Sequence, residues 1–226
     1  MYCSDYEILK TILPVDTSIG NDLSSLSNPN NRLNDLIHES NAISIFTDGS
    51  KVSSRSYVGS ACICPELSIC IRKSMPCEAS VFTAECVALS DALDVALEHR
   101  SHSFLIFSDS LSALQSLKSS FLTIKTNPYI FEIKEKYVKF FANNSYNSFI
   151  TFFWVPSHNG VRGNEEADFQ AKSATEKDFL DILRIPYTDL YELFKKKSFS
   201  LSTDIILEQG LVKELTITIW LNLWPV

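Results

Sequence analysis

The sequence of 226 residues is long enough for one α/β domain with appendages or for two small domains, and its 45% hydrophobic and 21% charged residues predict a sizeable core. A net charge of −7 argues against a polybasic membrane anchor or a generic nucleic-acid-binding tail. The charge is uneven, since residues 42–174 hold twelve basic and thirteen acidic groups. A polyanionic substrate would therefore dock on this nearly balanced part with the help of metal ions.

The cysteines and the apolar runs indicate in which cellular compartment the protein is expected. The six cysteines show no metal-ligand spacing and are predicted to be small buried hydrophobes in a reducing, intracellular compartment, cytoplasmic or nuclear. The opening MYCSDYEI carries acids where a signal peptide needs a basic and then an apolar stretch. The longest apolar run, 215–226, is too short to cross a bilayer, so no membrane association is expected.

Residues 1–41 are predicted to be a leader or linker, because the stretch 18–35 is rich in Ser, Asn, Asp and Gly and has no sustained period. The next residues, 42–47, are mostly apolar and predict a short strand. This strand is predicted to end on one carboxylate, Asp48, after which a Gly-Ser pair turns the chain away. Asp-Gly is also one of the commonest turn pairs, so Asp48 alone is weak evidence of a functional site.

Two further strands, 58–64 and 68–73, complete a predicted antiparallel meander. A long helix follows over 81–98, and Glu85 begins a helical stripe that otherwise faces the core, formed by Leu89, Ala92 and Ala96. A carboxylate on such a stripe is costly unless something compensates it. The alternative is a first-turn glutamate that is favoured by the helix dipole or belongs to a cap.

The next strand, 103–108, is a continuous apolar run that is typical of a strand buried on both faces. It ends on Asp109, for which a helix N-cap is the simpler interpretation, because a helix is predicted from Ser110 onward. A second helix, 129–143, is predicted to turn its apolar residues inward and its three lysines to solvent, namely Lys134, Lys136 and Lys139.

A last buried strand, 148–155, leads into VPSHNGVRGNEEADFQAK, which predicts a glycine-containing loop and a short helix. His158 lies in the middle of the loop, and Asn164 is predicted to cap the helix that carries Asp168. A lone histidine in a loop is usually only exposed, but several polar landmarks in one strand–loop–helix unit favour a functional site. Beyond residue 175 the chain is predicted to be helix-rich, with helical segments at 180–183 and 189–197.

Four single carboxylates thus stand at strand ends, on an inward stripe or on the last helix: Asp48, Glu85, Asp109 and Asp168. No cysteine or histidine cluster accompanies them, and an all-oxygen site suits Mg²⁺ or Mn²⁺ rather than zinc. Four converging acids repel one another without a cation. Two divalent ions about 3.5–4 Å apart suit the in-line displacement of a phosphodiester, so the pattern predicts a two-ion site.

The motifs IFTDGS, FTAEC, FSDS and VPSHNGVRGNEEAD, in this order, resemble the ribonuclease H family over roughly residues 42–175. The spacing agrees with that family: 37 residues from Asp48 to Glu85, 24 to Asp109 and 59 more to Asp168. The resemblance implies an α/β, ribonuclease H-like three-layer fold with a mixed five-stranded sheet and helices on both faces. It also implies that the four acids are catalytic ligands of two Mg²⁺ or Mn²⁺ ions.

By the same resemblance the protein is an endonuclease that cuts the RNA strand of RNA–DNA hybrids. His158 would assist proton transfer or product release, and Gly49 and Ser50 would contact the substrate. The expected organisation is a leader or linker over 1–41, a ribonuclease H-like domain over 42–175 and a C-terminal extension of unassigned role over 176–226.

The stretch SHNGVRGNEEAD is similar to the ribonuclease H domains that follow reverse transcriptases in non-LTR retrotransposons. Val81 and Phe82 stand where cellular members carry an Asn-Gln pair that reads 2′-hydroxyls. A reverse transcriptase domain is therefore an expected partner, and the chain is expected to be a fragment of a retroelement polyprotein or a domesticated remnant. The rival interpretation is a catalytically silent nucleic-acid-binding or scaffold remnant. A DNA-cleaving integrase or resolvase relative is disfavoured by the fourth acid and the SHNG loop.

Overall fold

The computed structural model describes residues 8, 10–120, 126–142, 147–176 and 184–208. The chain divides into two compact units, 1–186 and 187–226. The elements in chain order are β1 (Val15–Asp16), α2 (Ser18–Ser25), α3 (Pro29–Ser40), β2 (Ile43–Lys51), β3 (Tyr57–Cys64), β4 (Ile69–Pro76), α4 (Val81–Glu98), β5 (Phe104–Ser108), α5 (Leu111–Lys118), α6 (Pro128–Phe141), β6 (Ile150–Trp154), α7 (Arg162–Ala174) and α8 (Tyr187–Glu208).

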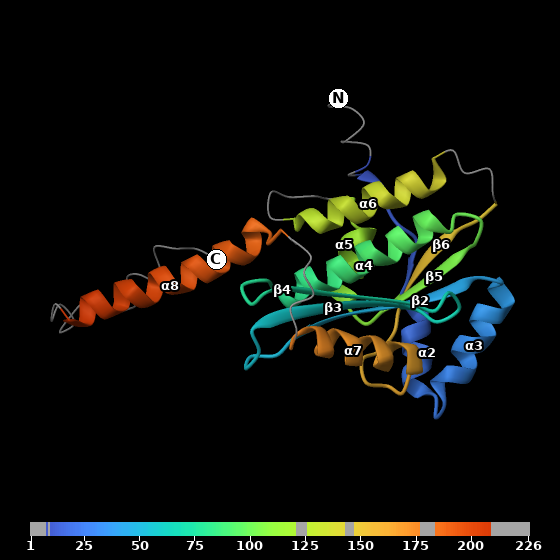
Figure 1. Ribbon diagram of the computed structural model, residues 1–226, viewed down its shortest axis with the longest axis horizontal. Helices are drawn as coiled ribbons and strands as arrows, with labels where there is room; N and C mark the ends of the chain where they lie inside the picture. Colours follow the sequence, from blue (N-terminus) through green and yellow to red (C-terminus); the bar gives the residue numbers. More distant parts are fainter. Residues whose placement is uncertain (1–7, 9, 121–125, 143–146, 177–183, 209–226) are drawn as a thin grey trace. The chain divides into compact units, whose positions relative to one another are not determined.

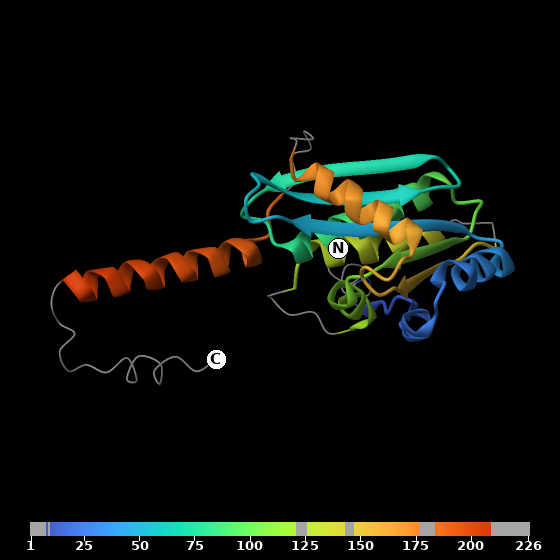
Figure 2. The same cartoon turned by 90° about the horizontal axis from the view of Figure 1, so that it is seen from below.

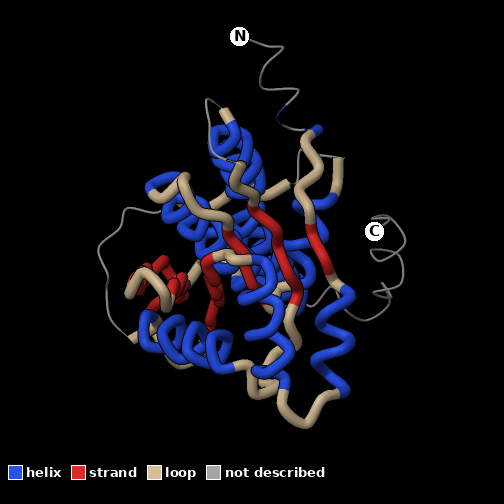
Figure 3. The backbone as a smooth tube through the Cα atoms, turned by 90° about the vertical axis from the view of Figure 1, so that its right-hand side faces the viewer, coloured by secondary structure: helices blue, strands red, loops and turns tan. Residues whose placement is uncertain are grey.

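The strands of the first unit form one mixed sheet in the order β1-β6-β5-β2-β3-β4. β1, β6, β5 and β2 are parallel neighbours, whereas β2, β3 and β4 form the predicted antiparallel meander. Figure 3 shows the strands in red among the helices in blue. The α/β architecture with a mixed sheet is confirmed, with six strands rather than five, because the two-residue β1 pairs with β6 at the edge.

Helices cover both faces of the sheet, as expected. Figure 1 shows α4, α5 and α6 on one side and α2, α3 and α7 on the other, and Figure 2 shows α7 lying across the strands. On the side of α7, the rings of Phe46, Phe107 and Phe153 stack across β2, β5 and β6, with centroids 5.0 and 5.5 Å apart. This row of rings holds the three strands in register and supports the strand ends where the acids lie.

The stretch 18–35, where a leader or linker without sustained periodicity is expected, is helical. It forms α2 and the start of α3, and Ile19, Leu23 and Leu33 are buried in the core on that side of the sheet. Ile19 and Leu23 lie four residues apart, on one helical face, while Ser, Asn and Asp fill the solvent face. Composition indicated a linker because two short helices need few apolar residues to pack on an existing sheet.

One of the predicted outward lysines is buried. Lys134 is 0% exposed, its Nζ donates to the Ser119 carbonyl at 2.6 Å, and burial lowers its pKa. The side chain of Lys136, also on α6, reaches α4 and pairs with Asp94 at 2.7 Å. Of the three lysines, Lys139 is the one with a mostly exposed side chain. The amphipathic pattern missed Lys134 because a long aliphatic stem can cross a helix interface to reach a carbonyl at a helix end.

The second unit contains α8, which extends the helix predicted over 189–197 in both directions. The helical segment predicted at 180–183 lies outside the described residues, as does the apolar run at 215–226. Among the helices of the described ranges, none is both long enough and apolar enough to span a bilayer.

Candidate active site

Asp48 lies within β2. The turn predicted at Gly49 is wrong, because the strand continues past this residue. Gly49 and Ser50 instead continue the antiparallel pairing with β3, opposite Ser60 and Gly59. A side chain at Gly49 would place its Cβ 2.5 Å from the backbone nitrogen of Glu85. Glycine here therefore serves the close approach of α4 to β2 rather than a turn.

Glu85 lies in the second turn of α4 and is only 7% exposed. The helix is capped by Ser80, whose side chain accepts from Thr83 N at 3.1 Å, so Glu85 is not part of the cap. The Gly49 backbone lies against the carboxyl and opposes the rise that burial causes in its pKa. The interpretation as an inward carboxylate is thus the one that the structure supports.

Asp109 follows the last residue of β5. Its Oδ2 accepts hydrogen bonds from Ser157 Oγ at 2.7 Å and from Asn164 Nδ2 at 3.3 Å, and its carbonyl accepts from Trp154 Nε1 at 3.1 Å. The N-cap position of α5 belongs to Ser110. Asp109 is therefore oriented by the β6–α7 connection, not by its own helix.

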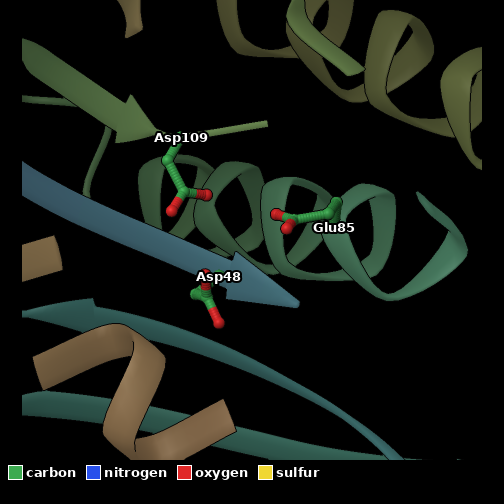
Figure 4. Close-up of side chains that lie close together, drawn as sticks. All are labelled: Asp48, Glu85 and Asp109. Atoms are coloured by element: carbon green, nitrogen blue, oxygen red, sulfur yellow. The ribbon is translucent and has the colours of Figure 1, made fainter. Parts of the chain in front are cut away.

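The three carboxylates converge. Asp48, Glu85 and Asp109 each offer an oxygen, and these oxygens lie within 4.8 Å of one another. Figure 4 shows Asp48 on β2, Asp109 just after β5 and Glu85 on the facing helix. Within the described residues, Asp48 Oδ2 and Glu85 Oε2 are buried without a hydrogen-bond partner. Buried carboxylate oxygens without donors are costly, so the arrangement fits a bound cation.

The electrostatics of the cluster agree with this. Burial, followed by the charges of Asp109 and Asp168, raises the pKa of Asp48 to about 8, while Lys172 opposes the shift. Burial, followed by Asp48 and Asp109, raises the pKa of Glu85 well above its usual range. A divalent ion would offset the cost of holding these negative charges close together, and an all-oxygen donor set suits Mg²⁺ or Mn²⁺.

The fourth predicted acid lies apart from this trio. Asp168, on α7, has a side chain that is 21% exposed and pairs with Lys172 at 2.6 Å, one helical turn on. It is near enough to Asp48 to raise the pKa of that acid. The structure thus brings three of the four acids into direct proximity and leaves Asp168 at the rim, neutralised by a lysine.

His158 is exposed in the loop between β6 and α7, with a left-handed backbone at φ 51°. It is not among the converging residues. The neighbouring Ser157 bonds Asp109, so the loop reaches the site through its serine.

Comparison with known proteins identifies the family. A model of ribonuclease H matches residues 40–176, more than half of the chain. The chain belongs to the ribonuclease H family. The match begins before β2 and ends after α7, so it includes the four acids and the His158 loop. A search of curated proteins finds no match.

Within this ribonuclease H domain, sequence reasoning missed two residues that orient Asp109. Ser157 was not singled out, although it stands beside His158 in the SHNG motif. Asn164 was predicted to cap a helix, but α7 begins at Arg162 with Val161 as its N-cap, and the buried Asn164 amide points to Asp109. A polar residue inside the first turn of a helix that follows a site loop is the signal that was available.

Proposed function

We propose that the protein is an endonuclease that hydrolyses the RNA strand of RNA–DNA hybrids. The observation that carries the proposal is the convergence of Asp48, Glu85 and Asp109 around buried carboxylate oxygens without donors, in a chain of the ribonuclease H family. Two Mg²⁺ or Mn²⁺ ions would be held by these three acids and by Asp168. When bound, such ions supply positive charge against the phosphodiester and make water a better nucleophile.

The acids would work in two ways. Asp48 and Glu85, whose pKa values are raised, would give up their protons to become ligands of a cation. Asp109 is held by Ser157 and Asn164 and presents a fixed direction of approach. Preorganised carboxylates of this kind would hold cations in fixed positions for the phosphate without rearrangement of the sheet.

Asp168 would join the site from the rim. Its pairing with Lys172 is partly exposed, and such pairs are weak enough to be exchanged for a divalent ion. The ε-ammonium group, once released, is free to face the substrate phosphate. Asp168 therefore serves as the ligand whose engagement depends on loading of the site.

His158 is the proposed group for proton transfer or product release, because it is exposed on a loop next to Ser157, which bonds Asp109. Imidazoles exchange protons near neutral pH, which suits either task. Gly49 and Ser50 remain proposed substrate contacts. Gly49 has no side chain and Ser50 is buried, so these contacts would involve main-chain atoms.

The domain limits and the retroelement association are also part of the proposal. The nuclease domain is taken as 42–175, and a reverse transcriptase domain as a partner. Support for the partner is confined to the stretch SHNGVRGNEEAD and to Val81 and Phe82. Val81 is exposed at the start of α4, where an apolar residue cannot hydrogen-bond a 2′-hydroxyl.

One experiment tests the activity. The protein is incubated with an end-labelled RNA–DNA hybrid, an RNA duplex and a DNA duplex, each with Mg²⁺ or with EDTA. We expect cutting of the RNA strand of the hybrid, only with Mg²⁺. Binding of the hybrid without cutting would favour the silent-remnant alternative, and equal cutting of all three substrates would refute the proposed specificity.

A further inference from the structure

The helices before β2 contact the loop that carries His158. Asn30, in the first turn of α3, bonds this loop twice: its Nδ2 donates to the Gly160 carbonyl at 2.7 Å, and its Oδ1 accepts from the Arg162 N–H at 3.0 Å. From α2, the Leu23 carbonyl accepts from Asn159 Nδ2 at 2.9 Å. Three hydrogen bonds thus join the N-terminal helices to three of the four residues that follow His158, namely Asn159, Gly160 and Arg162.

The loop needs external support because its backbone is unfavourable. His158 has φ 51° and Gly160 has φ 75°, so two residues with a left-handed backbone are separated only by Asn159. Glycine adopts this conformation readily, but a histidine does so at a cost. Within the loop, Gly160 N donates to Glu165 Oε1 at 3.0 Å. The paired contacts of Asn30, to a carbonyl and to an N–H two residues apart, resemble those of a neighbouring strand and hold the turn in place.

The other end of the loop is tied to the acid cluster. Ser157 Oγ donates to Asp109 Oδ2 at 2.7 Å. His158 therefore stands between one neighbour that is bonded to a site acid and another, Asn159, that is bonded to α2. A shift of the Asn30 contacts would move the histidine relative to Asp109, since only His158 and Asn159 separate Ser157 from Gly160, the nearest residue that Asn30 bonds.

A second contact of the same helices reaches the site by packing. Gly20 of α2 lies so close to Trp154 that a Cβ there would stand 2.2 Å from the indole ring. The Trp154 Nε1 donates to the Asp109 carbonyl at 3.1 Å. Helix α2 thus supports the backbone of Asp109 independently of the loop.

We propose that Asn30 is a positioning residue, which acts by holding the His158 loop in the conformation used for cleavage, and that α2 and α3 are a working part of the nuclease. This inference rests on the proposed function. A positioning role affects turnover more than substrate binding, because the loop geometry matters most when the proton moves.

Kinetics of hybrid cleavage test the inference. For Asn30→Ala we expect kcat to fall about ten-fold, the effect of losing two modest hydrogen bonds, with KM changed less than about two-fold. Asn30→Asp keeps the acceptor for the Arg162 N–H but loses the donor to the Gly160 carbonyl. Its kcat should lie between those of the native protein and Asn30→Ala. The matched control is Asn31→Ala, an exposed asparagine in the same helical turn, with kcat unchanged.

A double variant separates positioning from a merely structural role. If Asn30 acts through the loop, Asn30→Ala should lower kcat in the native protein but not further in a His158→Ala background. Equal effects in both backgrounds would overturn the inference, as would an Asn30→Ala variant as fast as the native protein.

Amide hydrogen exchange provides a readout that does not depend on activity. The Arg162 amide should exchange faster in Asn30→Ala and at the native rate in Asn31→Ala. An unchanged exchange rate in Asn30→Ala would show that Asn30 does not hold the loop. If the native protein leaves the hybrid intact while Arg162 exchange responds as expected, the proposed function is refuted, and with it the catalytic role of the Asn30 contacts. A native protein that cuts while Asn30→Ala cuts equally fast would refute only the present inference.

Discussion

Asp48 and Asp109 lie at the same level on two neighbouring parallel strands, Asp48 within β2 and Asp109 just after β5. The residues just before them, Thr47 and Ser108, form the last pair between β2 and β5. The two carboxylates therefore lie side by side, where the pairing between these two central strands ends. Since strand pairing and not a loop determines this arrangement, the two acids are preorganised before any ligand arrives.

Replacing Asp48 with asparagine should separate activity from folding. The variant keeps the shape of the side chain but removes the charge that a cation requires, so hybrid cleavage should fall by at least about 10²-fold. The far-ultraviolet circular dichroism should stay native. Asp22→Asn, at an exposed position on α2, is the matched control and should cleave at the native rate. Native activity in Asp48→Asn would show that this acid is not a ligand.

The raised pKa of Asp48 predicts the pH dependence of stability without metal. The folded-state pKa is about 8, against an ordinary value of 3.8, so the folded protein holds a proton that the unfolded chain has lost. This contribution to the free energy of unfolding is fully present below about pH 4 and is lost as the pH rises through about 8. Denaturant titrations in EDTA should show a decline over that window that is shallower in Asp48→Asn. Parallel declines in the two proteins would contradict it.

Glu85→Gln should remove the response of stability to metal. If the folded acid cluster binds Mn²⁺ as proposed and the unfolded chain does not, millimolar Mn²⁺ should raise the melting temperature of the native protein. In Glu85→Gln the cluster of three acids lacks one charge, and the rise should be abolished or strongly reduced. Glu98→Gln, at the exposed end of the same helix, should retain the full rise. An equal rise in both variants would place the ion elsewhere.

The convergence of the acids was predictable because local patterns report burial. The continuous apolar run before Asp109 indicated a strand buried on both faces, and the structure has β5 in the centre of the sheet. The stripe that begins at Glu85 indicated an inward carboxylate, and Glu85 is 7% exposed. Each signal is a property of a few neighbouring residues, so it survives without knowledge of the tertiary contacts.

The misplaced features depend on contacts between distant residues. Asp-Gly favours a turn in isolation, but Gly49 pairs with Ser60 across a hairpin, and sheet pairing prevails over turn propensity. Asn164 has the residue type of an N-cap, yet its amide is used by Asp109, 55 positions away. The Asn30 contacts span 130 and 132 positions. No local pattern contains information on such partners.

Gly59→Ala tests how α7 is held on the sheet. A Cβ at Gly59 would stand 2.1 Å from the Ala171 carbonyl, a backbone atom that cannot move alone, so the helix must shift. We expect a loss of about 1–3 kcal/mol in the free energy of unfolding, as for other overpacked sites. Ser60→Ala is the matched control on the same strand. Its hydroxyl is buried without a partner in the described residues, so its removal should be neutral or stabilising. A Gly59→Ala variant as stable as the native protein would contradict this packing.

The last prediction separates His158 from Asp168. His158 is exposed and lies outside the acid cluster, so His158→Ala should lower hybrid cleavage by about 10²-fold or less, the lower end of general acid–base effects, and leave Mn²⁺ binding nearly unchanged. Asp168 contributes negative charge next to Asp48, so Asp168→Asn should weaken Mn²⁺ binding as well as cleavage. Calorimetric Mn²⁺ titrations and cleavage assays on both variants decide between the roles. Loss of Mn²⁺ binding in His158→Ala would make the histidine a ligand and the all-carboxylate description wrong. Native Mn²⁺ binding in Asp168→Asn would confine the ion site to Asp48, Glu85 and Asp109.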